Sequence, residues 1–218
     1  RYLPRMLSQD MNTLLRGTQF MTEKAAGSDV GKIETEACMV DGQWRLYGDK
    51  WFCSHADADV AMILARPEGA PSGTRGLGMF LLPRHRPDGT RNAYRIVRLK
   101  DKLGTRSMAS GEIHLEGALV HPVGDLQRGL KQMLDQVNLS RLSHGMRAAS
   151  MMRRCLNEAL ACARSRPAFG GFIEQLPLVQ RELRKMHTRT EHALSVCMFA
   201  ASVMSNDDAD SDTLLRIL

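Results

Sequence analysis

The feature that most constrains the fold of this 218-residue chain is a change of hydrophobic period at residues 122–124. Before this point, short apolar runs are separated by turn-forming pairs such as Asp41-Gly42. After it, apolar residues recur at helical spacing, beginning with Leu126, Leu130 and Met133. Short strands separated by turns are typical of a β-barrel or sandwich. The sequence therefore predicts an α+β fold, in which this β-domain is followed by a long helical hairpin.

The hairpin is predicted by two helical patterns. The first extends with few breakers to about Arg166, and the second extends from about Pro177 to Met204. Proline and glycine residues at 167–171 separate them, which favours a tight connection. Small residues at 143–150 allow a neighbouring helix or a ligand to approach closely. The residues expected on the buried side of the second helix are Leu183, Met186, Leu194, Cys197 and Met198.

Two helices form only half of a four-helix bundle and cannot cover both of their own apolar stripes. Further sequence, a second subunit, or both must complete the bundle. In the first half, we expect strands at 44–47, 60–64, 79–82 and 112–115. The predicted parts are the end of a helical domain at 1–17, a β-barrel at 18–120 and a partial helical bundle at 121–218.

Composition indicates a globular protein without a membrane span. Hydrophobic residues make up 43% and charged residues 25% of the chain, and no apolar run reaches 18 residues. No signal peptide is recognised, so we expect a cytoplasmic protein. The five cysteines are odd in number and form no Cys-x-x-Cys pair, so neither a disulfide framework nor a zinc site is predicted. Most of them are expected to be small buried hydrophobes.

The charge of +6 is concentrated in one segment. Between Arg75 and Arg106 there are nine Lys or Arg residues against two aspartates, Asp88 and Asp101. Such an excess suits nucleic acid or an anionic cofactor. The favoured interpretation is a solvated rim of the β-domain with Arg-rich loops, because the segment itself lacks the interleaved aromatics of a single-strand binder.

The loop Met21–Val30 is the strongest candidate for ligand binding. Gly27 can adopt a positive φ and allow a close approach of the main chain, while Thr22 and Ser28 supply hydroxyls. Such a loop suits a phosphate or a flavin ring. Taken alone, Gly-Ser-Asp is equally typical of an ordinary polar hairpin turn.

A second motif, Gly48 to His55, gives the loop a context. Thr22, Glu23, Gly27, Ser28 and Asp29 match the Thr-Glu-x-x-x-Gly-Ser-Asp loop of acyl-CoA dehydrogenases. That family follows it with Lys-x-Trp-Ile-Thr-Asn, for which this chain has Lys50, Phe52, Cys53, Ser54 and His55. Within that family, the chain most resembles the AidB branch, because the first motif begins Met-Thr-Glu-Lys and the second reads Lys-Trp-Phe-x-Ser.

This resemblance implies an FAD-binding fragment with the β-domain and the first two bundle helices. Residues 102–107 resemble the family's Lys-Leu-Gly-x-Arg stretch, and residues 166–170 resemble the turn that reaches the flavin nucleotide of the adjacent subunit. The implied substrate-binding residues are Ser28 and Arg141. The implied cofactor-binding residues are Met21, Thr22, Gly27, Ser28, Phe52, Cys53, Ser54, Arg166 and Phe169.

The resemblance also implies FAD-dependent dehydrogenation of acyl-CoA thioesters in a homo-oligomer assembled through the bundle. Proton abstraction requires a carboxylate. One family position for it reads Ser140, directly before Arg141, and the other follows Leu218, so no catalytic residue is assigned unless Glu23 or Asp135 serves. The alternatives are an AidB-like flavoprotein that binds double-stranded DNA with little turnover, and an oligomerisation piece without flavin. No metal site is predicted, because His187 and His192 do not share a helix face.

Overall fold

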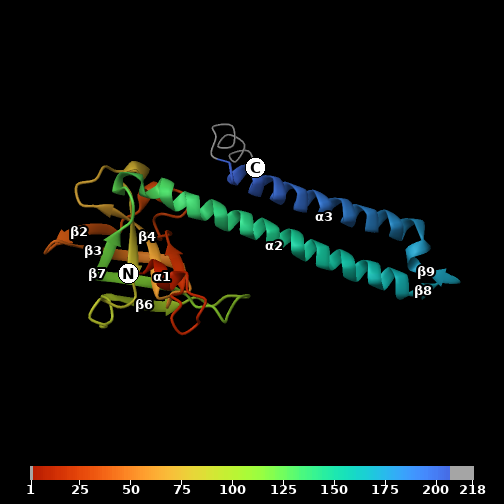
Figure 1. Ribbon diagram of the computed structural model, residues 1–218, viewed down its shortest axis with the longest axis horizontal. Helices are drawn as coiled ribbons and strands as arrows, with labels where there is room; N and C mark the ends of the chain where they lie inside the picture. Colours follow the sequence, from red (N-terminus) through yellow and green to blue (C-terminus); the bar gives the residue numbers. More distant parts are fainter. Residues whose placement is uncertain (1, 207–218) are drawn as a thin grey trace. The chain divides into compact units, whose positions relative to one another are not determined.

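The computed structural model describes residues 2–206, which form a β-domain and a helical hairpin (Figure 1). The chain divides into two compact units, Arg1–Asp135 and Gln136–Leu218. The first unit opens with the short helix α1 (Leu3–Met6). It then contains seven strands, which are β1 (Gly17–Phe20), β2 (Glu36–Val40), β3 (Gln43–Ser54), β4 (Val60–Pro67), β5 (Gly78–Pro83), β6 (Tyr94–Leu99) and β7 (Ser110–Pro122).

Five of these strands close into a barrel. Following the pairings around the sheet, β4 pairs with β5, β5 with β7, β7 with β3, β3 with β2, and β2 again with β4. Strands β1 and β6 are added outside this ring, on β4 and β7 respectively. Closure removes the unpaired edges that an open sheet of these strands would present. The predicted β-domain is therefore a barrel and not two separate sheets.

The barrel is held together by a single apolar core. Phe80, Leu46 and Ile113 are fully buried in it, and the ring of Trp44 meets Phe80 edge to face with centroids 5.6 Å apart. The β2–β3 hairpin closes through Asp41 and Gly42, both of which have positive φ. This is the two-residue turn that an Asp-Gly pair favours.

Three differences from the predicted strands have physical reasons. All four predicted strands exist, but β3 and β7 are longer, because their central pairing continues beyond the apolar runs. Strand β6 was expected to be Arg-rich loop, and this was wrong. Tyr94 is buried and Ile96 partly so, with the exposed Arg95 between them, and a bulge between Ile96 and Arg98 then leaves Val97, Arg98 and Leu99 exposed. The charges obscured an alternating strand pattern.

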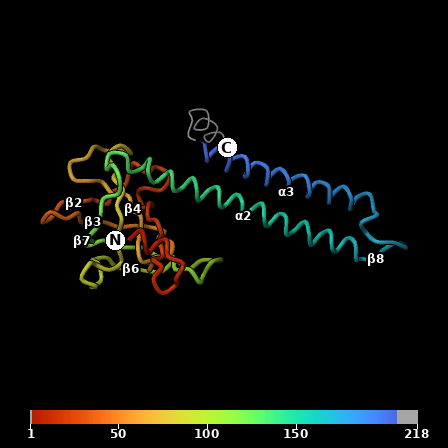
Figure 2. Tube along the Cα trace, viewed as in Figure 1, coloured from red at the N-terminus to blue at the C-terminus, as the bar shows by residue number. Residues whose placement is uncertain are grey.

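The helical hairpin consists of α2 (Gly129–Ser165) and α3 (Pro177–Met204), joined by the small strands β8 (Pro167–Ala168) and β9 (Gly171–Phe172). Figures 1 and 2 show the two helices running antiparallel. They approach closely at Gly145, where an added Cβ would lie 3.0 Å from the Cys197 sulfur. The predicted close approach of a helix at the small residues is thus observed. Along residues 2–206, no helix combines the length and apolar character that a membrane crossing requires.

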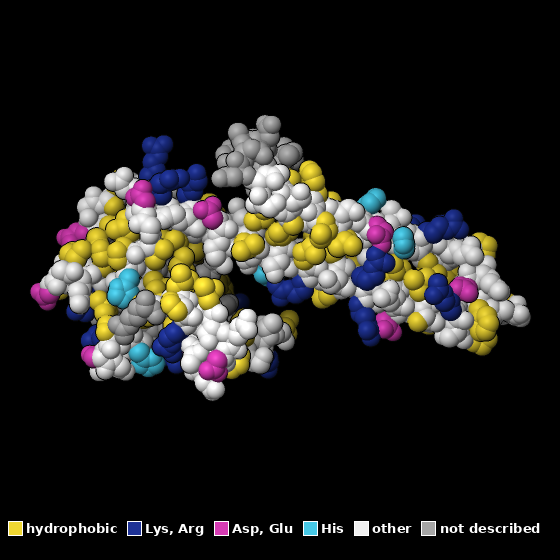
Figure 3. All heavy atoms as spheres, in the orientation of Figure 1, with side chains coloured by type: hydrophobic (Ala, Val, Ile, Leu, Met, Phe, Trp, Pro, Cys, Tyr) yellow, Lys and Arg dark blue, Asp and Glu magenta, His cyan; other side chains and the backbone are white. Residues whose placement is uncertain are grey.

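The predicted buried side of α3 is only partly right. Leu183, Met186 and Cys197 are half-buried, whereas Leu194 and Met198 are exposed. The buried residues of α3 are instead Thr190 and Val203. The hairpin therefore leaves apolar side chains uncovered, and Figure 3 shows hydrophobic atoms along it. Its exposed large apolar residues include Leu139, Met151, Leu194, Val196, Met198 and Phe199.

Candidate functional site

The two motif segments lie side by side in the β-domain. The loop Met21–Val30 follows β1, and the second motif occupies the end of β3. The Trp51 N–H donates to the Thr22 carbonyl at 2.8 Å, and the Thr18 hydroxyl donates to the Ser54 carbonyl at 2.6 Å. Residues about thirty positions apart in sequence thus form one surface.

A β-bulge shapes this surface. Opposite β7, the register passes from Lys50 with Ile113 to Cys53 with Gly111, so that Trp51 and Phe52 together face one residue. Phe52 has φ 55°, a left-handed conformation that is rare for an aromatic residue. Phe52 is 49% exposed, whereas the neighbouring Cys53 is fully buried. The bulge therefore presents an aromatic ring at the surface.

Cations surround the two aromatic rings of the bulge. The Lys100 ammonium lies 4.1 Å from the centre of the Phe52 ring, and the Lys24 ammonium lies 4.6 Å from that of Trp51. The Arg98 guanidinium is 5.4 Å from the Trp51 ring. The charged segment lacks its own interleaved aromatics, but β3 supplies them in space. Sequence spacing alone did not reveal this arrangement.

Hydroxyl groups next to the bulge remain available to a ligand. Within the described part of the chain, the hydroxyls of Thr22 and Ser28 form no hydrogen bond. The Ser54 hydroxyl has one weak partner, Ser110, at 3.4 Å. Met21 is half-buried at the start of the loop. These donors, together with the exposed ring, fit the polar edge and flat face of a flavin.

The predicted role of Gly27 is corrected. Its φ is not positive, and a Cβ built on it meets no atom within 4 Å. The backbone of this chain therefore does not require glycine at this position. The open space beside it is compatible with ligand approach, but left-handed geometry is not the reason for the residue.

A buried ion pair fastens the loop to β3. Lys50 is 1% and Glu23 5% exposed, and the Lys50 ammonium lies 2.5 Å from Glu23 Oε1. The same carboxylate accepts from the Thr35 hydroxyl at 2.5 Å, the Thr35 N–H at 3.2 Å and the Glu34 N–H at 2.7 Å. Both residues belong to the motifs, yet their pairing, 27 residues apart, was not predicted from the sequence.

The environment of Glu23 makes it unsuitable as a general base. Burial favours a higher pKa, but Lys50, Thr35 and the Glu34 N–H outweigh burial and lower the pKa of Glu23 below its ordinary value. A carboxylate held by four donors has little affinity for a proton. Cys53 is also unreactive, since burial raises its thiol pKa to about 12 against the attraction of Lys50.

The remaining predicted residues lie in the second unit. Arg141 is exposed on α2, where its guanidinium donates to Asn138 at 3.1 Å. Arg166 follows the end of α2, and its carbonyl accepts from the Ile173 N–H at 3.1 Å. Phe169, at the tip of the β8–β9 turn, has φ 53° and is 94% exposed. Arg166 and Phe169 thus lie in the same short connection between the helices, and Phe169 projects into solvent.

Histidine and cysteine form no metal centre in the described residues. No group of three His, Cys, Asp or Glu side chains there has the arrangement to hold a metal ion. All five cysteines are free, but the expectation that most are buried was wrong. Only Cys53 is buried, Cys38 and Cys197 are half-buried, and Cys155 and Cys162 are exposed on α2.

Sequence comparison accounts for both parts of the chain. The family models described as acyl-CoA dehydrogenase, middle domain, and acyl-CoA dehydrogenase, C-terminal domain, match residues 18–118 and 127–215. The chain belongs to the acyl-CoA dehydrogenase family. The predicted family is therefore confirmed, and the matches place the β-barrel in its middle domain and the hairpin in its C-terminal domain.

Individual relatives agree. The chain is 36% identical to acyl-CoA dehydrogenase family member 11 of Caenorhabditis elegans over 94% of its own length and 34% of that protein's. It is 39% identical to the putative acyl-CoA dehydrogenase AidB of Escherichia coli over 78% of this chain and 31% of that one. The chain thus spans about a third of the length of these curated relatives.

Solved structures show the same fold. The structure of Caenorhabditis elegans ACDH-11 in complex with C11-CoA superposes with a TM-score of 0.85 at 34% identity, covering 97% of this chain and 38% of that one. Butyryl-CoA dehydrogenase from Megasphaera elsdenii shares the fold with a TM-score of 0.75 at 22% identity, covering 85% and 48%. The α+β prediction of a family β-domain followed by long helices is confirmed.

Proposed function

We propose that this chain forms the flavin-binding part of an FAD-dependent oxidoreductase that dehydrogenates acyl-CoA thioesters. The observation that carries the proposal is the bulge at Trp51 and Phe52, which exposes an aromatic ring beside the unpaired hydroxyl of Thr22. Family membership supports the reaction class. When bound, FAD would accept the hydride removed from the acyl chain.

The residues of this chain would hold and orient the cofactor. Phe52 offers the flat face on which the ring system stacks, and Thr22 and Ser54 offer hydroxyls to its polar edge. Met21 and Cys53 flank these groups, and Gly27 leaves space for approach. In an adjacent subunit, Arg166 would give charge-assisted hydrogen bonds to the FAD pyrophosphate, and Phe169 an apolar contact.

Substrate binding is assigned to Ser28 and Arg141, with the Ser28 hydroxyl unpaired in the described residues and the Arg141 guanidinium at the helix surface. No general base is assigned among residues 2–206. Ser140, beside Arg141, cannot take a proton from carbon, and Glu23 is committed to Lys50. We infer that the chain binds cofactor and thioester without completing dehydrogenation by itself.

Assembly follows from the uncovered apolar side chains of the hairpin. We infer a homo-oligomer in which helices of a second copy cover Leu139, Val196 and Phe199, and in which the Arg166 turn reaches a neighbouring flavin. The expected compartment is the cytoplasm.

The test of the flavin site is an FAD titration of the 218-residue chain, followed by flavin fluorescence. The double variant Thr22→Ala/Ser54→Ala should bind FAD about 5- to 150-fold more weakly, because each lost hydrogen bond is worth about 0.5–1.5 kcal/mol. The matched control, Ser72→Ala/Thr188→Ala, removes two exposed hydroxyls elsewhere and should bind as the parent does. Unchanged affinity in the first double variant would refute the placement. A parent chain that binds no FAD would instead favour a piece that serves oligomerisation alone.

A second candidate function is favoured by a basic face on α3. Arg181, Arg184, Lys185 and Arg189 recur at helical spacing, and with Thr188 they line a shallow cleft of about 400 Å³. Glu182 pairs with Arg181 and Lys185, which leaves a net excess of positive charge. Such a face suits the phosphates of double-stranded DNA, as in an AidB-like DNA-associated flavoprotein with little turnover.

Salt dependence distinguishes this candidate from simple surface charge. If the face contacts three or four phosphates, the logarithm of the association constant for duplex DNA should fall with the logarithm of salt concentration with a slope of about −3. Arg184→Gln/Arg189→Gln should reduce the magnitude of that slope by about two. Arg154→Gln, which removes an exposed arginine of α2, should leave the slope unchanged. Equal slopes in all three proteins would exclude the face as the contact.

A further inference from the structure

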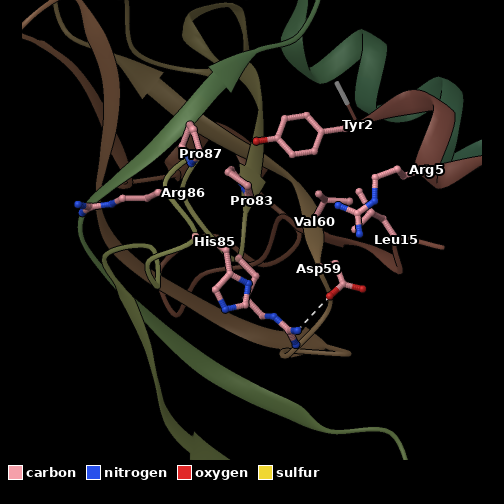
Figure 4. A pocket seen from close by; sticks show the side chains of 11 residues that line it. Tyr2, Arg5, Leu15, Asp59, Val60, Pro83, His85, Arg86 and Pro87 are labelled. Atoms are coloured by element: carbon pink, nitrogen blue, oxygen red, sulfur yellow. Dashed lines mark ion pairs between the residues drawn. The ribbon is translucent and has the colours of Figure 1, made fainter. Parts of the chain in front are cut away.

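A cavity lies in the β-domain between α1 and the connection from β5 to β6, and Figure 4 shows its lining. It has a volume of about 420 Å³, within the usual range for a small-molecule site. No residue of the candidate flavin site contributes to it. Its charged lining consists of Arg5, Arg84, Arg86 and Asp59, and an apolar wall is formed by Leu15, Val60 and Pro83.

Asp59 is the single carboxylate among these groups, and both of its oxygens already have arginine partners. Asp59 Oδ2 accepts from the Arg16 N–H at 3.0 Å and the Arg16 guanidinium at 3.2 Å, and Oδ1 pairs with Arg84 at 3.1 Å. Burial favours a higher pKa of Asp59, but Arg16 and Arg84 outweigh it and lower that pKa. Two guanidinium groups therefore share one negative charge, which leaves one positive charge in excess.

Other donors at the cavity lack an acceptor. The Nε of Arg84 is buried without any hydrogen-bond partner, although its other nitrogens bind Asp59 and the Asp57 carbonyl. Arg5 uses only its Nε, towards the Thr13 carbonyl at 3.2 Å, and forms no ion pair within the described residues. A buried unpaired N–H is unfavourable unless a ligand or water satisfies it.

The arrangement of these side chains selects one end of the cavity. In Figure 4, Arg5 and Asp59 lie on the same side, and Arg86 extends away from them. Arg5 adds a second positive charge to the one left by the shared carboxylate. Without Arg86, which points away, the net charge at this end is near +2 and matches a phosphate monoester, which carries about −1.5 to −2 at neutral pH.

We propose that this cavity binds a small organic phosphate, with the phosphoryl group between Arg5 and Arg84 and the organic group against Leu15, Val60 and Pro83. The two arginines supply several N–H donors, which suits three phosphoryl oxygens better than a single carboxylate. Because the apolar wall can contact an organic group, we expect the cavity to bind a phosphate ester more tightly than free phosphate. The site is separate from the flavin surface and can be loaded independently of it.

Isothermal titration calorimetry of the 218-residue chain with phenyl phosphate tests the proposal. We expect one-site binding with a Kd below about 1 mM, and weaker binding of inorganic phosphate and of phenol, each of which offers half of the contacts. Arg5→Gln should weaken phenyl phosphate binding about tenfold or more, because it removes a charge-assisted contact. Arg5 is exposed, so this variant should fold.

Two control variants make the result decisive. Arg75→Gln removes an exposed arginine of the same domain outside the cavity and should bind phenyl phosphate like the parent. Thr22→Ala/Ser54→Ala should also bind it unchanged, which separates this site from the flavin site. Absence of binding at millimolar concentration, equal binding of inorganic phosphate, or equal losses in Arg5→Gln and Arg75→Gln would each overturn the proposal.

Discussion

Replacing Lys50 with methionine should destabilise the β-domain strongly. The substitution keeps the length and apolar stem of the side chain but removes the cation from Glu23, which is 5% exposed. The carboxylate would keep three of its four donors, two from Thr35 and one from Glu34, without a compensating charge. Breaking a buried pair in this way costs about 3–5 kcal/mol.

Urea denaturation followed by tryptophan fluorescence measures this effect. With a slope of about 2 kcal/mol per molar urea, the midpoint should fall by roughly 2 M. The matched control, Lys32→Met, breaks the exposed Lys32–Asp29 pair and should change stability by no more than about 0.5 kcal/mol. The Glu23→Gln/Lys50→Met variant should recover much of the loss, because no unpaired charge remains buried and the amide oxygen can still accept from Thr35 and Glu34.

The pH dependence supplies an independent check. In the parent, the folded pKa of Glu23 is lowered from 4.5, so the stability it contributes is complete above pH 4.5 and is lost as pH falls through the lower folded value. In Lys50→Met, burial without the cation should raise the folded pKa, so protonation in acid relieves the variant. The stability deficit of Lys50→Met relative to the parent should therefore shrink as pH falls below the raised folded pKa of Glu23 in the variant. A deficit under 1 kcal/mol, or one that does not change with pH, would refute the reasoning.

Three further predictions concern the whole chain. Light scattering at micromolar concentration should show self-association, because the hairpin exposes apolar residues such as Val196 and Phe199, and a stable monomer would contradict this. With FAD and acyl-CoA under anaerobic conditions, the flavin band should bleach at least 100-fold more slowly than in an active family member, because Ser140 cannot act as a base and Glu23 is paired with Lys50. Bleaching at an ordinary rate would implicate a carboxylate such as Asp135. A thiol reagent at pH 8 should label Cys155 and Cys162 within the time in which Cys53, with a pKa of about 12, stays unmodified. Equal labelling would show that the barrel opens readily.

The sequence predicted the elements whose local pattern agrees with their surroundings. The bounds of α3 were predicted at Pro177 and Met204, since proline is favoured in the first helical turn and the apolar period continues to the end. Strand β6 was missed because its outward positions carry Arg95 and Arg98, which dominated the interpretation of that segment. Its alternation with Tyr94 and Ile96 was visible but was given less weight than charge.

The candidate site was predictable only in part, because its geometry depends on tertiary register. The motif matches indicated Thr22, Phe52 and Ser54, but the bulge arises from the pairing of β3 with β7, more than fifty residues later. The cavity beside Asp59 likewise collects Arg5 and Arg84 from segments about 80 residues apart. No local sequence pattern indicates that these distant segments lie next to each other in the fold.

The exposed ring of Phe52 follows from what anchors the residues on either side of the bulge. Lys50 is tied inside the barrel to Glu23, and Cys53 is fully buried in the core. Two residues must therefore fit between two inward-facing positions, which requires the extra residue of a bulge and the left-handed φ of Phe52. Such strain persists only where surrounding structure fixes it, and it is commonest at functional sites. The ion pair and the buried cysteine thus have a joint role: they hold an aromatic ring at the surface that the hydrophobic effect alone would bury.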